Sequence, residues 1–230
     1  SPPRRFTSAR QEINMPPVPP MLAKLHEQFS LRGLNTFGVE ARARWFCLVR
    51  SVDDLAALAA DPRLAGLPWL VLGGGSNLLL TRDFDGLVIK VEVAGLHELG
   101  DAGDAWHVEV GAGENWHATV ERLVTMGRPG LENLALIPGS CGAAPVQNIG
   151  AYGLELAQRF DSLTAWDFTS QRVVRMTAAE CAFGYRDSLF KHTLAGRRLI
   201  LAVRLALPKT PCRTRFIRAM AAVMVISSCP

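Results

Sequence analysis

A glycine-rich segment lies between two apolar runs, and this arrangement constrains the fold more than any other feature of the chain. Residues 69–72 ("WLVL") and 86–93 ("GLVIKVEV") are short, apolar and bounded by turn residues, so both predict strands. The stretch "GGGSN" (residues 73–77) follows the first run directly. Consecutive glycines allow the backbone to approach a neighbour or a ligand without interference from Cβ atoms. We therefore expect two strands joined by a loop whose backbone closely contacts either a neighbouring segment or a ligand.

A helix is predicted just before this pair of strands. Ser51 and Asp54 form a variant of the capping box, Leu55 and Leu58 give an apolar face, and Pro62 ends the helix. Together these segments predict a βαββ unit over residues 37–93.

The second half of the chain carries comparable signals. Residues 105–113 alternate and predict a half-exposed strand, and residues 162–168 and 172–176 predict a hairpin. A capping box at residues 177–180 predicts a short helix that ends at Gly184, and residues 197–207 predict a last strand followed by Pro208. A helix over residues 114–127 is predicted from an apolar stripe formed by Trp116, Val120, Leu123 and Val124, with Gly127 after its end.

Composition excludes several classes of protein. The 230 residues are 49% hydrophobic and 20% charged, enough for the core of one large domain or two small ones. The net charge of +4 and the scattered basic residues disfavour a nucleic-acid partner. No apolar run reaches the roughly 18 residues that a membrane helix needs. The five cysteines are odd in number and lack C-x-x-C spacing, which indicates reduced, intracellular thiols rather than disulfides or a zinc site.

Both ends of the chain differ from its centre. Residues 1–20 are polar and proline-rich, and we expect either a disordered leader or sequence that precedes a true start at Met15 or Met21. Residues 210–230 contain an apolar piece without a predicted partner element. We read this segment as a tail that follows the folded part.

The glycine loop has two readings. A run of exposed backbone N–H groups can form an anion-binding nest suited to a phosphate or diphosphate, with Ser76 and Asn77 adding polar groups. The alternative is a tight turn between strands. The loop is not a Walker A motif, because no Gly-Lys-Ser/Thr follows, and it is a poor dinucleotide-binding fingerprint because a strand rather than a helix follows it.

A second glycine-rich region and a short polar motif add to the first. Residues 130–153 form a long irregular segment, which is usually functional in a compact domain, although an ordinary surface loop is the alternative. Two such segments favour an extended, phosphate-bearing ligand.

The motif "GYRDS" (residues 184–188) carries polar side chains. Arg186 offers a fork of N–H donors for a carboxylate, Tyr185 offers a hydroxyl, and Asp187 offers a group that orients the arginine. A surface ion pair is the alternative. The histidines show no metal spacing, and we expect His117 to be structural or exposed.

Several long motifs occur in an order that resembles one enzyme family. They are "NTFGVEARA", "LGGGSNLLL", "VGAGENWHATV", "GLENLALIPGSCGAAPVQNIGAYGLEL" and "AECAFGYRDSLFKH". The chain resembles the UDP-N-acetylenolpyruvoylglucosamine reductase family, type I branch, over residues 34 to 209. The resemblance implies an α+β FAD-binding module of the vanillyl-alcohol-oxidase (PCMH-type) fold, with one subdomain over residues 21–93 and a second over 94–209. It also implies that residues 210–230 are a non-homologous tail, and that the C-terminal substrate domain is missing through truncation.

The resemblance further implies cofactors, a substrate and site residues. FAD and NADPH are the cofactors, UDP-N-acetylglucosamine enolpyruvate is the substrate, and the expected setting is a cytoplasmic monomer without nucleic-acid or membrane partners. Arg186 and Tyr185 are the implied catalytic residues, with Lys191 a weaker candidate for anionic groups. The implied cofactor-binding residues are Gly73, Gly74, Gly75, Ser76, Asn77, Leu78, Ile137, Pro138, Gly139, Ser140, Cys141, Gly142, Gln147, Asn148, Gly150, Ala151 and Tyr152.

The chain departs from the family's pattern after the FAD-binding module, where the family's proton-transfer residues lie. The family's serine proton donor and its glutamate partner have no counterpart here, and Ser227 and Ser228 do not fit the role. We therefore expect FAD binding with poor or absent substrate reduction. The alternatives are a non-catalytic FAD-binding module and an FAD oxidase of the same fold.

Overall fold

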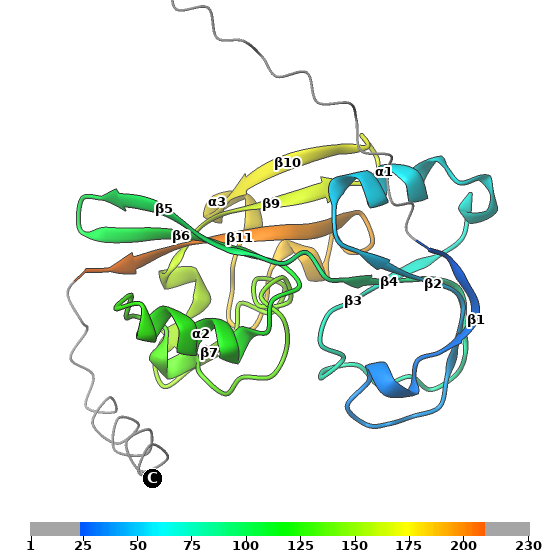
Figure 1. Cartoon of the computed structure of the whole chain (residues 1–230), viewed down its shortest axis with the longest axis horizontal. Helices are drawn as coiled ribbons and strands as arrows, with labels where there is room; N and C mark the ends of the chain where they lie inside the picture. Colours follow the sequence, from blue (N-terminus) through cyan, green and yellow to red (C-terminus); the bar gives the residue numbers. More distant parts are fainter. Residues whose placement is uncertain (1–23, 210–230) are drawn as a thin grey trace, which may run out of the picture.

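The computed structural model describes residues 24–209 and consists of two sheets with helices and loops packed on them (Figure 1). The predicted leader (1–20) and the predicted tail (210–230) lie outside the described residues.

The first sheet has four strands in the order β1-β2-β4-β3. Strand β1 (His26–Ser30) is antiparallel to β2 (Arg42–Val49), whereas β2 and β3 (Trp69–Leu72) both run parallel to β4 (Phe84–Val91). Helix α1 (Val52–Ala60) and a short 3-10 turn (Pro62–Leu64) connect β2 to β3, so the predicted βαββ unit is confirmed. No helix lies between β3 and β4. The glycine loop begins the connection between these two parallel strands.

The local signals for α1 act as predicted. The Ser51 hydroxyl accepts a hydrogen bond from the Asp54 amide at 3.2 Å, and the Asp54 carboxylate accepts one from the Ser51 amide at 3.0 Å. Leu55 and Leu58 are buried beneath the helix. The capping box therefore fixes where the helix begins, and its apolar face fixes how it packs.

The second sheet is antiparallel throughout, in the order β10-β9-β11-β6-β5. It contains the predicted hairpin and the predicted last strand. A two-stranded ribbon, β7 paired with β8, and a 3-10 turn (Glu132–Leu134) lie within or just after the irregular segment. The remaining elements are β5 (Leu96–Ala102), β6 (Ala105–Gly111), α2 (Trp116–Thr125), β7 (Gly150–Ala151), β8 (Leu154–Glu155), β9 (Phe160–Asp167), β10 (Arg172–Thr177), α3 (Ala178–Cys181) and β11 (Arg198–Pro208), with 3-10 turns at Arg32–Leu34, Leu156–Gln158 and Leu189–Lys191.

Three details of the sequence prediction were wrong. Val124 is exposed on α2, and Thr119 takes its place on the buried face because that face follows the i, i+3, i+4, i+7 spacing from Trp116. Helix α3 ends at Cys181 rather than at Gly184, since Ala182 already adopts the left-handed conformation (φ 45°) that ends a helix. Pro208 is the last residue of β11 rather than the first residue after it, and it lies opposite Ala105 of β6.

The two sheets share one hydrophobic core. Its buried residues come from β2, β4 and α1 on one side and from β6, α2, β9 and β11 on the other. The Gly111 and Gly113 amides donate to the Gly95 and Val93 carbonyls at 2.7 and 2.8 Å, so backbone hydrogen bonds also join the end of β6 to the connection between β4 and β5. The strands of the two sheets lie on either side of this junction, and we retain the subdivision into residues 21–93 and 94–209 as a proposal.

Helix lengths and three cysteine environments can be described for residues 24–209. Within residues 24–209, no helix is both long and apolar enough to cross a membrane. Cys47, Cys141 and Cys181 are free and buried. Burial raises the pKa of each of the three thiols to about 12, so none of them is a thiolate at neutral pH.

Candidate cofactor-binding cleft

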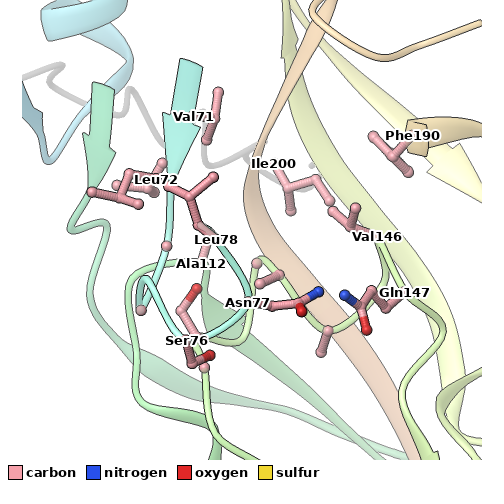
Figure 2. A pocket seen from close by; sticks show the side chains of 18 of the residues that line it. Val71, Leu72, Ser76, Asn77, Leu78, Ala112, Val146, Gln147, Phe190 and Ile200 are labelled. Atoms are coloured by element: carbon pink, nitrogen blue, oxygen red, sulfur yellow. The ribbon is translucent and has the colours of Figure 1, made fainter. Parts of the chain in front are cut away.

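A cleft of about 620 Å³ is lined by residues from both sheets (Figure 2). One wall is formed by β3 and the glycine loop, and the other by residues around 137–147 and 186–200. Asn77 and Gln147 point toward one another in Figure 2. Of the residues implied by the sequence, those that line the cleft are Gly73, Gly74, Gly75, Ser76, Asn77, Leu78, Ile137, Pro138, Gly139, Ser140, Gly142, Gln147, Arg186 and Lys191.

The two glycine-rich segments meet through their backbones. A Cβ atom on Gly74 would lie 3.0 Å from the Gly139 Cα atom, which is closer than such atoms normally pack. The second segment is fixed in turn, because the Trp116 amide donates to the Gly139 carbonyl at 3.0 Å and the Cys141 amide donates to the Glu114 carbonyl at 2.8 Å. The sequence thus places glycine where the two walls approach one another.

The glycine loop presents unpaired backbone donors. Within the described residues, no amide of residues 74–77 donates a hydrogen bond to a protein acceptor. Gly75 has φ +67°, in the left-handed region, and a Cβ atom there would overlap the Leu34 carbonyl oxygen. A run of free N–H groups in such a turn is an anion-binding arrangement.

Arg186 lies on a turn that is hydrogen-bonded to the cleft wall. Its Nη2 donates to the Gly150 carbonyl at 2.6 Å, and Lys191 Nζ donates to the Arg186 carbonyl at 2.6 Å. Asn148 Nδ2 donates to the Gly184 carbonyl at 2.9 Å and holds the start of the turn. These bonds fix a permanent positive charge at the cleft.

The expected role of Asp187 was wrong. Its carboxylate lies 2.8 Å from His192 Nε2 rather than against Arg186. That hydrogen bond is the main reason why the pKa of the Asp187 carboxyl falls below its ordinary value. Arg186 is oriented by the Gly150 carbonyl instead.

Six implied residues do not line the cleft. Cys141 is buried, with its Sγ 3.3 Å from Thr119 Oγ1, and Asn148 is buried with its amide bonded to Glu155, Ala157 and Gly184. Both therefore lie within the wall, behind its surface. The remaining four are Gly150 and Ala151 in β7 and the exposed Tyr152 and Tyr185.

Much of the apolar lining was missed by sequence reasoning. Val71, Ala112, Val146, Phe190 and Ile200 all line the cleft (Figure 2). In sequence these residues are indistinguishable from ordinary core residues, and only the arrangement of the strands and loops reveals them. His117 behaves as expected for a structural residue, since its Nδ1 accepts a hydrogen bond from the Leu136 amide at 3.3 Å.

The lining suits an anionic ligand that also has apolar parts. Free amides and three cationic side chains, Arg186, Lys191 and Arg198, line the cleft, while no Asp or Glu is among its described lining residues. No group of three or more His, Cys, Asp or Glu within residues 24–209 is arranged to hold a metal ion. FAD combines a diphosphate with two ring systems, so the residues present fit this cofactor.

Comparisons with known proteins agree with this fit. The chain is 55% identical over 191 residues to UDP-N-acetylenolpyruvoylglucosamine reductase of Burkholderia mallei (strain NCTC 10229), a match that covers 83% of this chain and 55% of the relative. The chain therefore spans about half the length of the curated relatives it matches.

Solved structures show the same fold. UDP-N-acetylenolpyruvylglucosamine reductase from Thermus caldophilus superposes with a TM-score of 0.66 at 26% identity, covering 89% of this chain and 68% of the other. Cholesterol oxidase from B. sterolicum superposes with a TM-score of 0.53 at 19% identity, covering 84% of this chain and 39% of the other. The α+β fold expected from the sequence is thus confirmed.

A family model described as "FAD binding domain" matches residues 43–177, which run from β2 through the cleft to the end of β10. The matched segment includes both glycine-rich segments of the cleft and the junction between the sheets, but not the lining residues within 186–200. On this match, the chain belongs to the FAD binding domain family.

Proposed function

We propose that the chain binds FAD in this cleft. We further propose that it serves the NADPH-dependent reduction of UDP-N-acetylglucosamine enolpyruvate to UDP-N-acetylmuramate, a step in peptidoglycan precursor synthesis for the cell wall. The observation that carries the proposal is the pair of glycine-lined walls, with free amides and cationic side chains facing one cleft. The resemblance to curated reductases supports the choice of substrate.

The two walls of the cleft are proposed to contact different parts of the cofactor. Residues 73–78 hold the cofactor's diphosphate through backbone amides, and residues 137–142 with Gln147 line the opposite side. When bound, FAD supplies a group that accepts a hydride and passes it on. Cys141 and Asn148 support the wall from behind, since both are buried and bonded within it.

Arg186 is the residue proposed to act on the substrate, and Tyr185 flanks it. A fixed guanidinium beside the substrate carboxylate stabilises the negative charge that develops when the enolpyruvyl group is reduced. The hydrogen bond to Gly150 holds the guanidinium in place. We further propose that the chain acts as a monomer in the cytoplasm, which is consistent with its free cysteines.

The first test of the proposal is the flavin content of the purified chain. We expect the protein to retain near-stoichiometric FAD with a flavin absorbance spectrum, and the released cofactor to elute as FAD rather than FMN. A folded, colourless protein that fails to bind added FAD would refute the assignment. Oxygen-dependent turnover by the flavin-bound protein in the absence of the nucleotide sugar would indicate an oxidase instead.

Arg186→Ala separates the catalytic role from cofactor binding. Made at the matching arginine of a full-length relative, this substitution is expected to lower substrate-dependent NADPH oxidation by about 100-fold or more, because a preorganised charge at the reacting group is lost. The affinity for FAD should change by less than about 3-fold, the scale of one weak contact. Rates and flavin titrations are compared with Arg175→Ala, which removes an exposed arginine that pairs with Asp161 away from the cleft lining. Equal losses of rate and affinity would contradict the role.

A further inference from the structure

A segment far from the cleft in sequence packs behind the glycine loop. Residues 31–39 ("LRGLNTFGV") form a compact turn closed by the buried side chain of Asn35. Asn35 Nδ2 donates to the Leu31 and Val39 carbonyls at 2.8 and 3.0 Å, and Oδ1 accepts from the Val39 amide at 2.9 Å. We name this segment the brace.

The brace contacts the glycine loop at Gly75. The Thr36 amide and the Thr36 hydroxyl both donate to the Gly75 carbonyl, at 3.1 and 3.3 Å. The Leu34 carbonyl oxygen occupies the space that a side chain at position 75 would need. The direction of the Gly75 carbonyl is therefore fixed by two donors from the brace.

Fixing this carbonyl also fixes the next amide. The described peptide bonds are all trans, and in a trans peptide the C=O of one residue and the N–H of the next point in opposite directions. The Ser76 N–H therefore points away from Thr36. Ser76 lines the cleft, and its amide donates to no acceptor among the described residues.

We propose that Thr36 is a positioning residue that holds the Gly75–Ser76 peptide so that the Ser76 amide faces the cofactor's diphosphate. This inference rests on the proposed function, because it assigns a diphosphate to the glycine loop. Thr36 acts through the loop and contacts no ligand itself. Holding the donor in place before binding removes the cost of ordering it during binding.

The test compares three variants. Thr36→Val removes the hydroxyl while keeping the shape of the side chain, and Thr36→Ser restores a hydroxyl. Thr125→Val is the matched control, since it removes a threonine hydroxyl that also donates to a backbone carbonyl, that of Glu121, away from the cleft lining. Thr36 is exposed, so its substitution should leave the fold intact.

We expect Thr36→Val to weaken the binding of FAD and of ADP, which share the diphosphate, by the same factor of about 3- to 10-fold. Without ligand, the amide hydrogen of residue 36, which is bonded to the Gly75 carbonyl, should exchange faster relative to its intrinsic rate. The thermal midpoint should stay near that of the unmodified protein. Thr36→Ser should restore affinity, and Thr125→Val should leave both affinities unchanged.

The outcomes separate this inference from the proposed function. Unmodified protein that binds neither FAD nor ADP refutes the proposed function and the inference together. FAD binding that Thr36→Val leaves unchanged, or protection of the residue 36 amide against hydrogen exchange that it leaves unchanged, refutes the role of the brace alone. A fall in affinity matched by a comparable fall in the thermal midpoint would identify Thr36 as merely structural and also overturn the inference.

Discussion

Trp116→Ala is expected to lower the free energy of unfolding by about 3–5 kcal/mol, the range for removing a large buried aromatic side chain. Trp116 is the first residue of α2 and only 1% exposed, in the core shared by both sheets. Its indole Nε1 donates to the Leu134 carbonyl at 2.8 Å. The alanine variant leaves a cavity and also leaves this buried carbonyl without its donor.

Urea denaturation followed by circular dichroism measures the effect. Trp116→Phe keeps most of the ring volume but loses the donor, so a smaller cost of about 1–3 kcal/mol is expected. Val124→Ala, on the exposed side of the same helix, should cost about 0.5 kcal/mol or less. If Trp116→Ala cost no more than Val124→Ala, the placement of Trp116 in the core would be wrong.

Gly75→Ala should weaken FAD binding by about 100-fold or more, equivalent to roughly 2.7 kcal/mol. The backbone at position 75 has φ +67°, which itself costs a residue other than glycine about 1–2 kcal/mol. The added Cβ would also overlap the Leu34 carbonyl oxygen, so either the brace or the loop must move. Either movement disturbs the amides that face the cleft.

The matched control for this variant is Gly33→Ala. Gly33 lies in the brace itself, but a Cβ atom there meets nothing within 4 Å and its φ is not in the left-handed region. Flavin retained after gel filtration, together with titration of the apoprotein, gives both affinities. If the two alanine variants bound FAD equally, close packing at Gly75 would play no part in holding the cofactor.

Local sequence signals predicted the elements that local chemistry determines. The capping boxes placed α1 and α3, and the alternation of residues 105–113 placed β6. Strands β1 ("HEQFS") and β5 ("LHELGDA") were missed, because neither shows clear alternation and each is stabilised by pairing with a neighbouring strand. The sequence also does not indicate that β3 and β4 are parallel neighbours, since close pairs joined by a loop are usually antiparallel.

The sequence predicted the glycine-rich walls of the cleft but not its apolar lining. Glycine is conspicuous in sequence, so both glycine-rich walls could be identified from it. The apolar lining was not, because Val146, Phe190 and Ile200 resemble any core residue until the fold exposes them to a cavity. Position within a motif did not separate residues that face the cleft from those behind it, as Asn148 illustrates. The binding roles of these residues stay predictions.

The shared core has a consequence for how the protein unfolds and is degraded. Because one apolar cluster joins the two sheets, neither sheet can open fully without exposing the other, and we expect them to unfold as a single cooperative unit. A ligand bound between them then protects both, by about 2.7 kcal/mol when its free concentration is 100 times its dissociation constant. A chain made while flavin is scarce lacks this protection throughout its fold. Flavin supply would in this way set how long each newly made molecule survives proteolysis.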